Sequence, residues 1–167
     1  ALAKFVYGQV FEWLVARINS AVPGEGADNF IGILDISGFE IFAQNGFEQF
    51  CINFANEKIQ QYFNRQILQQ EQEIYELEGL RYRKVEFEDN QDIMDIVGTK
   101  GTGIFSLLDE ACRMPRATDV TFTIKVHTEH SSRACLAKPK YTQGAKRLRD
   151  DEAFVVCHFA GSVVYES

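Results

Sequence analysis

Residues 30–40 have the sequence Phe30-Ile31-Gly32-Ile33-Leu34-Asp35-Ile36-Ser37-Gly38-Phe39-Glu40. The near-continuous apolar run up to residue 36 predicts a β-strand buried on both faces, as parallel strands are. A carboxylate at its end, Asp35, is unfavourable to bury without a partner. In α/β nucleotide sites such an Asp faces a metal ion or its water, and a glycine such as Gly38 lets a phosphate approach a main-chain N–H. The pattern is equally compatible with an Asp35 that only caps the next turn.

A long helix is predicted to follow, from Asn45 to Leu77. Asn45 is a suitable N-cap with Glu48 three residues later, as in a capping box, and Gly79 is a suitable stop. The apolar residues of this segment lie on or near one stripe of a helix. They are Phe47, Phe50, Cys51, Phe54, Ile59, Tyr62, Phe63, Ile67, Ile74 and Leu77.

Shorter helices are predicted on both sides of this segment. Residues 2–22 form an amphipathic helix that ends at Pro23, with Trp13 expected in a core. Residues 85–97 combine a short extended piece with one or two helical turns. A further helix begins at Ile104.

That further helix is broken at Met114-Pro115, and the next one is capped by Thr118 or Asp119 and runs to His130. Residues 152–167 then alternate weakly, as a β-hairpin around Ala160-Gly161 would.

The segment from residue 131 to residue 149 is basic and contains no acid. A solvated loop is one interpretation of it, and a surface that steers an acidic partner is the other. Its charged residues are Arg133, Lys138, Lys140, Lys146, Arg147 and Arg149.

Composition excludes several classes of protein. The 167 residues are 46% hydrophobic, which is enough to bury the core of one domain. A net charge of −7 argues against a general nucleic-acid binder, and no apolar run is long enough to cross a membrane. The four cysteines form no C-x-x-C pair, which favours reduced intracellular thiols that pack. His127 and His130 have no carboxylate at ligand spacing, so a metal site there is not expected.

The segments 35–40 and 45–64 closely resemble the switch II loop and the relay helix of the myosin motor domain. The matching residues after Asp35–Glu40 are Asn45-Gly46-Phe47-Glu48-Gln49-Phe50-Cys51-Ile52-Asn53-Phe54 and Asn56-Glu57-Lys58-Ile59-Gln60-Gln61-Tyr62-Phe63-Asn64.

The resemblance extends over nearly the whole chain. Residues 1–19 resemble the helix before switch II, residues 103–122 the helix-loop-helix of the lower half of the actin-binding cleft, and residues 158–165 a hairpin of that subdomain. Segments Asp89–Asp92 and Arg149–Phe154 lean towards the class-six myosins.

The resemblance implies an α/β fold. The chain would be part of a P-loop NTPase motor domain, with one strand of the central sheet, long flanking helices and then a mainly helical subdomain with a terminal β-hairpin. Residues 1–29 would form the first helix and loop, 30–44 the strand and switch II, 45–84 the relay helix and relay loop, and 85–167 the lower actin-binding subdomain.

The resemblance also implies a function, that of an actin-based motor whose ATPase is activated by actin and uses ATP and Mg²⁺. Asp35 would hold Mg²⁺ through water, and Asp35, Ile36, Ser37 and Gly38 would bind the nucleotide, with Ser37 in a lesser role. The Gly38 N–H would donate to the γ-phosphate. Glu40 would pair with an Arg of switch I and position the attacking water.

Coupling and actin binding would use other residues. Phe39, Phe47, Phe50 and Phe54 would hold the relay helix in one of two arrangements, although a plain core role is the alternative. The actin-binding residues would be Thr102, Gly103, Ile104, Met114, Pro115 and Arg116. Many myosins carry a large apolar residue where Thr102 stands, so apolar docking would be weaker here.

Several further expectations follow from the resemblance. The partners would be F-actin and the P-loop, switch I and converter of the remaining motor domain. Nucleic acid and membrane insertion are not expected, and the location would be the cytoplasmic actin cytoskeleton. The sequence contains no G-x-x-x-x-G-K-[ST] and no switch I, so we expect a piece of a larger protein, inactive alone and with large exposed apolar surfaces.

Two alternatives to an active myosin motor are considered. One is a catalytically inactive actin-binding module that retains the fold, which the intact Asp35, Gly38 and Glu40 argue against. The other is another switch-containing NTPase such as kinesin, which the segment from Phe47 to Asn64 argues against.

Overall fold

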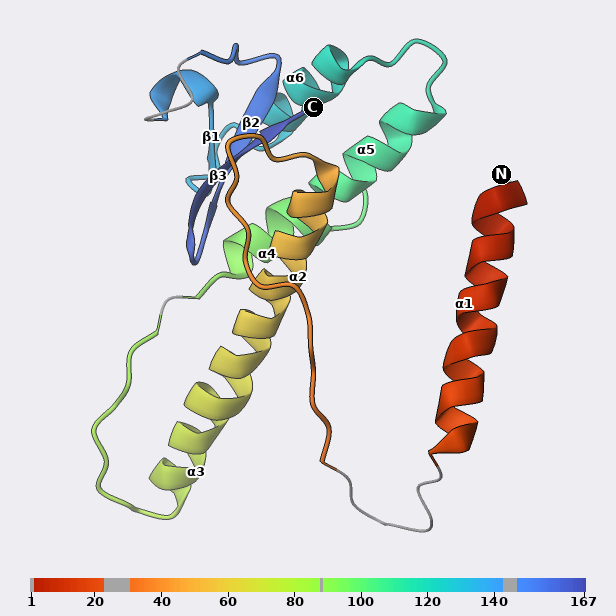
Figure 1. Ribbon diagram of the computed structural model, residues 1–167. Coiled ribbons are helices and arrows are strands. Elements are labelled where there is room, and N and C mark those ends of the chain that lie inside the picture. The colour runs from red at the N-terminus through yellow and green to blue at the C-terminus, as the bar shows by residue number, and fades with distance from the viewer. Residues whose placement is uncertain (1, 23–30, 88, 143–146) are drawn as a thin grey trace. The chain divides into compact units, whose positions relative to one another are not determined.

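The computed structural model describes residues 2–22, 31–87, 89–142 and 147–167. These residues fall into two units, Ala1–Ile36 and Ser37–Ser167, and each is described by itself (Figure 1).

The first unit contains helix α1 (Leu2–Ala21), close to the predicted range 2–22. Pro23, expected to end this helix, lies outside the described residues. No side chain of α1 is buried, and Trp13, expected in a core, is 66% exposed. An amphipathic helix gains most of its stability by packing its apolar face, and none of the described residues of this unit buries a side chain of that face.

The predicted central strand is wrong for this structure. Phe30 lies outside the described residues, and residues 31–36 form neither helix nor strand, with Ile33 97% exposed. A β-strand needs a neighbour that takes up its main-chain N–H and C=O groups. In the described part of the chain, every strand belongs to one sheet near the C-terminus, so residues 31–36 have no such neighbour.

The second unit begins with an irregular loop and a long helical segment. The segment consists of α2 (Phe47–Phe63), the π-helical η1 (Asn64–Gln69) and α3 (Gln70–Leu77). The helical run to Leu77 was predicted, but the π-helical part was not.

The N-terminal end of this segment differs from the prediction. The N-cap is Gly46, not Asn45, and the residue three positions later is Gln49, not Glu48. The Gly46 N–H donates to Gln49 Oε1 at 3.1 Å. Asn45 is not the cap because its carboxamide binds the main chain of the preceding loop and of a distant strand.

The C-terminal end confirms Gly79 as the stop. Gly79 has φ +68°, a left-handed conformation that glycine adopts without strain. Its N–H donates to Glu76 O at 3.2 Å, and the Leu80 N–H donates to Tyr75 O at 2.9 Å. This pair of bonds is the Schellman motif, which satisfies carbonyls left open at the end of a helix.

Three shorter helices follow, as predicted. They are α4 (Gln91–Gly98), α5 (Ile104–Arg113) and α6 (Asp119–Glu129). Met114 ends α5, and Thr118 caps α6 by accepting from the Thr121 N–H at 3.2 Å.

The C-terminal residues form a three-stranded antiparallel sheet in the order β1-β2-β3. Its strands are β1 (Leu136–Ala137), β2 (Ala153–His158) and β3 (Gly161–Glu166), and the 3-10 helix η2 (Pro139–Tyr141) follows β1. The hairpin predicted for residues 152–167 is confirmed. It turns at Phe159 and Ala160, because His158 pairs with Gly161.

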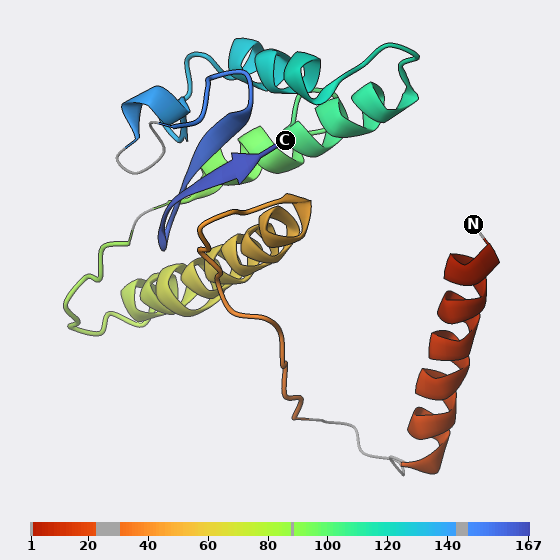
Figure 2. The same cartoon turned by 45° about the horizontal axis from the view of Figure 1, so that its top comes forward.

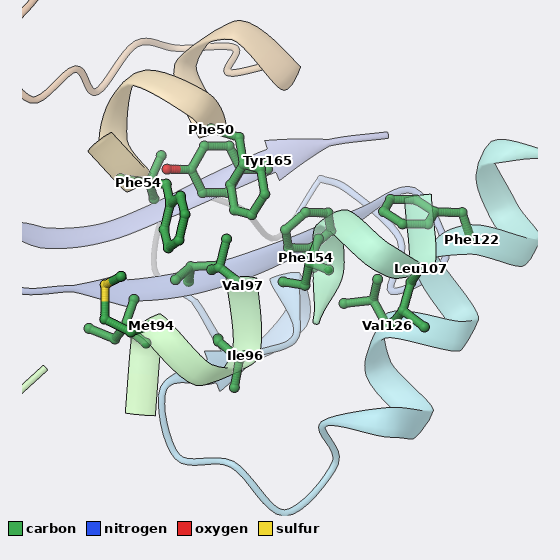
Figure 3. Packing of buried hydrophobic residues seen from close by; sticks show 14 residues of the cluster. Phe50, Phe54, Met94, Ile96, Val97, Leu107, Phe122, Val126, Phe154 and Tyr165 are labelled. Carbon is green, nitrogen blue, oxygen red and sulfur yellow. The ribbon is translucent and has the colours of Figure 1, made fainter. Parts of the chain in front are cut away.

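The core lies where this hairpin meets the helices. Helix α2 contacts β3, while α4 and α6 contact β2 (Figure 2). Figure 3 shows aromatic side chains of α2 and of the hairpin meeting the aliphatic side chains of α4 and α5. The buried cluster is Phe50, Phe54, Ile93, Met94, Ile96, Val97, Ile104, Leu107, Phe122, Val126, Phe154, Val156, Val163 and Tyr165.

All four cysteines are free, as predicted. Cys51, Cys135 and Cys157 are half-buried, whereas Cys112 is exposed at the end of α5 and does not pack.

Candidate functional site

Glu40 is held by its main chain. Its N–H donates to Asn53 Oδ1 at 2.8 Å, and its carbonyl accepts from Asn53 Nδ2 at 2.8 Å. Asn53 lies on α2 and is fully buried. The two bonds tie the loop to the helix and leave the half-buried Glu40 carboxylate without an ion pair among the described residues.

Gly38 and Ser37 precede Glu40 in an exposed stretch of loop. The carbonyl of Ser37 accepts from Asn56 Nδ2 at 2.9 Å, so a second amide of α2 holds the loop. A Cβ on Gly38 would meet no atom within 4 Å. Packing inside the described chain therefore does not require a glycine at this position.

Asp35 and Ile36 belong to the first unit, whereas Ser37, Gly38 and Glu40 belong to the second. Asp35 is exposed and has no ion pair within the described residues, and Ile36 is also exposed.

The four phenylalanines predicted to couple the loop to the helix divide into two groups. Phe47, Phe50 and Phe54 on α2 all pack against Phe105 of α5, with ring centroids 6.2, 5.2 and 5.3 Å away. Aromatic rings at these separations attract one another beyond the effect of buried area.

Phe39 packs elsewhere. Its ring lies edge-on to His158 at 5.2 Å and to Phe159 at 5.8 Å, at the end of the hairpin. The loop is therefore joined to the β2–β3 turn by Phe39, and α2 is joined to α5 by Phe105.

The six residues predicted to bind actin separate into exposed and buried ones. Thr102, Met114, Pro115 and Arg116 are exposed, with Met114 52% accessible. Ile104 is only 1% exposed and belongs to the core.

Gly103 has a packing role. A Cβ on Gly103 would lie 2.7 Å from the main-chain N and O of Thr99 and from the carbonyl of Val97, which is closer than real contacts allow. Glycine is therefore required where α4 and α5 approach each other.

Three of the five basic residues that the structure describes in the segment 131–149 are paired. Arg133 binds Asp92 at 2.9 Å, Lys140 binds Asp150 at 3.0 Å, and Arg149 binds Asp151 at 2.9 Å. These pairs favour the interpretation of this segment as a folded, solvated loop, because each of these positive charges has a local carboxylate.

A buried polar network was not predicted. Glu57 on α2 is 0% exposed, and its Oε1 accepts from Asn90 Nδ2 at 2.6 Å. Its Oε2 lies 2.9 Å from His158 Nδ1 and accepts from the Phe159 N–H at 3.3 Å.

The network continues to the loop. His158 Nε2 lies 2.8 Å from the Tyr165 hydroxyl, and that oxygen accepts from Asn53 Nδ2 at 2.9 Å. Asn53 in turn holds Glu40. The series Glu57, His158, Tyr165, Asn53 therefore connects a buried carboxylate to the main chain of the loop.

One sequence signal points to this network. Asn53 and Glu57 are four residues apart and follow the spacing of Phe50 and Phe54, so two polar side chains lie on the apolar stripe. Their partners on β2 and β3 are about a hundred residues away and cannot be derived from the spacing.

Burial raises the pKa of Tyr165 well above its ordinary value, more than the bond from Asn53 lowers it, and the nearby Glu57 charge adds a further small rise. The phenol therefore keeps its proton at physiological pH and can act as a donor.

The two histidines of the helix end bind main-chain carbonyls. His127 Nε2 lies 3.1 Å from Ala153 O, and His130 Nε2 lies 3.0 Å from Thr102 O. Within the described residues no cluster of three metal-ligating side chains occurs. No helix among those residues is long and apolar enough to cross a membrane.

Known proteins resemble the chain over its whole length. The model of the family Myosin head (motor domain) matches residues 1–167. Unconventional myosin-VI of Mus musculus is 48% identical over 169 residues, which cover 100% of this chain and 13% of the relative.

Two further relatives show the same coverage of this chain. Myosin heavy chain 95F of Drosophila melanogaster is 44% identical over 169 residues, covering 100% of this chain and 14% of its own length. Myosin-I heavy chain of Dictyostelium discoideum is 48% identical over 168 residues, covering 100% and 7%. This chain therefore spans only a small part of the length of each relative.

Proposed function

Because the chain belongs to the myosin motor-domain family, we propose that it is part of an actin-based motor that couples ATP hydrolysis to movement. The observation that carries the proposal is the match of the family model to every residue from 1 to 167. The 48% identity to mouse myosin-VI supports an assignment to the class-six myosins, although the Dictyostelium myosin-I heavy chain has the same identity to this chain. An inactive actin-binding module is not favoured, because Asp35, Gly38 and Glu40 are all present.

The loop residues suit ATP and Mg²⁺. Gly38 lies in open space although no contact of the described chain requires a glycine, which suits the close approach of a phosphate to its N–H. Asp35 is an exposed carboxylate without an ion pair in the described residues, and a carboxylate oxygen is a ligand that Mg²⁺ accepts through water. Bound Mg²⁺ would neutralise charge on the phosphates. Ile36 and Ser37 would line the same stretch.

Glu40 would position the attacking water, together with an Arg of switch I elsewhere in the motor. The main chain of Glu40 is fixed to Asn53, while its carboxylate has no ion pair among the described residues. The carboxylate is therefore free to bind the Arg and the water. Phosphoryl transfer depends chiefly on positioning and charge stabilisation. A displacement of this loop would therefore gate hydrolysis.

The helical segment α2-η1-α3 would carry the displacement towards the converter. Its first turns are bound to the loop by Asn53 and Asn56 and packed against α5 through Phe105. Phe39 adds a contact between the loop and the hairpin. The loop would then be coupled to the hairpin through Phe39, and α2 would be coupled to α5 through its three phenylalanines.

F-actin would contact the exposed turn between α5 and α6. Met114, Pro115 and Arg116 supply the accessible side chains of that turn. Thr102 would add an exposed side chain at the other end of α5, where Gly103 and Ile104 are buried. We place the motor in the cytoplasm on the actin cytoskeleton.

The test is Glu40→Ala in the full-length protein that carries this chain. Steady-state ATP turnover with saturating actin should fall about 100-fold, a loss typical of misplaced catalytic groups. The matched control is Glu48→Ala, which removes the same charge from an exposed position of α2. Unchanged turnover in Glu40→Ala would remove the assigned role.

A further inference from the structure

The buried network around Glu57 is not used by the reaction steps proposed above. It brings together residues from α2, from both strands of the hairpin and from the start of α4. Glu57, Asn53, Asn90, His158 and Tyr165 are each at most 6% exposed. Buried polar groups destabilise a fold unless they are hydrogen-bonded, so a network this large indicates a specific use for the geometry it fixes.

The direction of the hydrogen bonds can be assigned from one fixed donor. The Glu40 N–H can only donate, so the atom of Asn53 facing it is Oδ1, and Nδ2 must donate to Glu40 O and to the Tyr165 oxygen. Both protons of Nδ2 are thereby used. The Tyr165 proton is then available for His158 Nε2, and His158 Nδ1–H donates to Glu57 Oε2.

The Glu57 end is anchored more firmly than the loop end. The carboxylate accepts from Asn90 Nδ2, from the Phe159 N–H and from His158 Nδ1. The Asn90 carboxamide also donates to the main-chain carbonyl of Glu57 at 3.0 Å. Charge-assisted hydrogen bonds are about twice as strong as neutral ones. The carboxylate therefore holds the hairpin turn, α2 and the start of α4 in one arrangement.

We propose that Glu57 and His158 are positioning residues, which act through Tyr165 and Asn53 to fix the main chain of Glu40. The reaction they serve is the ATP hydrolysis proposed above, and the inference rests on that function for its kinetic consequence. Its structural consequence does not depend on catalysis. If the chain of bonds is cut at Tyr165, the carboxamide of Asn53 loses one partner and the Glu40 N–H is held less firmly.

The experiment uses Tyr165→Phe in the full-length protein, because this change removes one oxygen and keeps the ring in the core. The control is Thr123→Val, which removes a fully buried hydroxyl that donates to Asp119 O at 3.0 Å and contacts Ser167, away from the network. A second variant, His158→Asn, places an amide donor near Glu57 but cannot reach Tyr165.

The first readout is hydrogen–deuterium exchange at the Glu40 amide without nucleotide. Tyr165→Phe and His158→Asn should each speed exchange there several-fold. The double variant should exchange no faster than either single variant, because both changes interrupt the same series of hydrogen bonds. Thr123→Val should leave this amide unchanged. Unchanged exchange at Glu40 in Tyr165→Phe, or additive effects of the two changes, would overturn the positioning role.

The second readout is ATP hydrolysis measured in a single turnover. The rate of the hydrolysis step should fall about tenfold in Tyr165→Phe, with the KM for ATP unchanged, since binding of ATP does not require the exact place of Glu40. A loss of stability alone would lower the amount of active protein and leave that rate constant unchanged. If the unmutated protein does not hydrolyse ATP, the proposed function fails, while the exchange result still decides the positioning role.

Discussion

Single carboxamide side chains hold three irregular parts of the main chain. Asn45 binds the N–H and the carbonyl of Phe42 at 2.8 and 3.0 Å, and Asn53 does the same for Glu40 at 2.8 and 2.8 Å. Gln72 binds the N–H and carbonyl of Val85 at 2.8 and 3.2 Å. A carboxamide has both donors and an acceptor, so it replaces the two bonds that a neighbouring strand would supply.

Asn45→Ala should therefore destabilise the second unit although it is not a helix cap. Asn45 is 3% exposed, and its loss leaves the Phe42 N–H and the Val164 carbonyl without their partner. We expect the free energy of unfolding to fall by about 2 kcal/mol, the usual effect of leaving a buried polar group unsatisfied. The urea midpoint of the motor domain measures this. Gln44→Ala, at the exposed neighbouring position, should leave the midpoint unchanged, and equal effects of the two changes would contradict the role of Asn45.

At this scale the sequence named candidate residues, but it did not predict the contacts that the structure gives them. The sequence predicts Asn45 as the N-cap of the long helix, yet Gly46 is the N-cap and Gln49 accepts from its N–H. The bond of Asn45 to Val164 joins residues 119 positions apart, and no local pattern contains such information. Glu57 and His158 are likewise far apart, at 101 positions, so their contact could not be predicted from local spacing either.

The elements follow local physics closely. Periodic apolar spacing, a break at Met114-Pro115 and a cap at Thr118 sufficed to place α5 and α6. The π-helical η1 was not predicted, because it differs from the α-helix in its main-chain hydrogen-bond partners and the apolar residues of so short a segment carry no separate signal for that change.

The end of α3 depends on Gly79, which supplies a left-handed residue. Gly79→Ala should cost about 1–2 kcal/mol locally, since a Cβ disfavours φ near +68°. No atom would touch that Cβ within 4 Å, so the effect is one of main-chain conformation alone. Hydrogen exchange at the Leu80 amide, which donates to Tyr75 O, should speed up in this variant.

Gly79→Asn is the matched control for that prediction. Asparagine tolerates the left-handed region better than alanine, so its effect on the same amide should be smaller. Equal exchange rates in the two variants would show that conformation at Gly79 does not control this helix end.

At the scale of the whole molecule, the sequence predicted where helices and the hairpin form better than it predicted which other segments they pack against. Helix α2, helices α4 to α6 and the hairpin share one core, and the prediction of these elements succeeded because their apolar faces find partners within the same unit. The strand expected at residues 30–36 failed, because a strand is a property of at least two segments. The predicted exposure of large apolar side chains is confirmed by Phe5 and Ile31, which are 66% and 100% exposed, whereas the core position predicted for Trp13 is wrong, because it is 66% exposed.

The pH dependence of stability should include a contribution from His130, which joins the end of α6 to the turn before α5. Burial lowers the pKa of His130, more than its bond to Thr102 O and the nearby Glu129 raise it, and Arg133 lowers it further. The folded state therefore prefers the neutral ring. The stabilisation is complete above the unfolded pKa of about 6.5 and is lost as pH falls through the lowered folded value.

His130→Gln removes this titration and keeps a donor for Thr102. Urea unfolding between pH 7.5 and 5.5 should show a steeper loss of stability in the unmutated protein than in this variant. The comparison cancels the contributions of all other ionisable groups, which both proteins share. Parallel curves would contradict the assignment.

The bonds made by Asn45 also bear on how this protein ages. Asn45 precedes Gly46, and an Asn-Gly pair loses ammonia readily because the unhindered glycine nitrogen attacks the side-chain carbonyl. In the folded protein that carbonyl accepts from the Phe42 N–H, and the Gly46 N–H is engaged by Gln49. Unfolding removes both restraints. An Asp formed there cannot donate to Phe42 O or Val164 O, so deamidation while unfolded makes a thermal excursion partly irreversible.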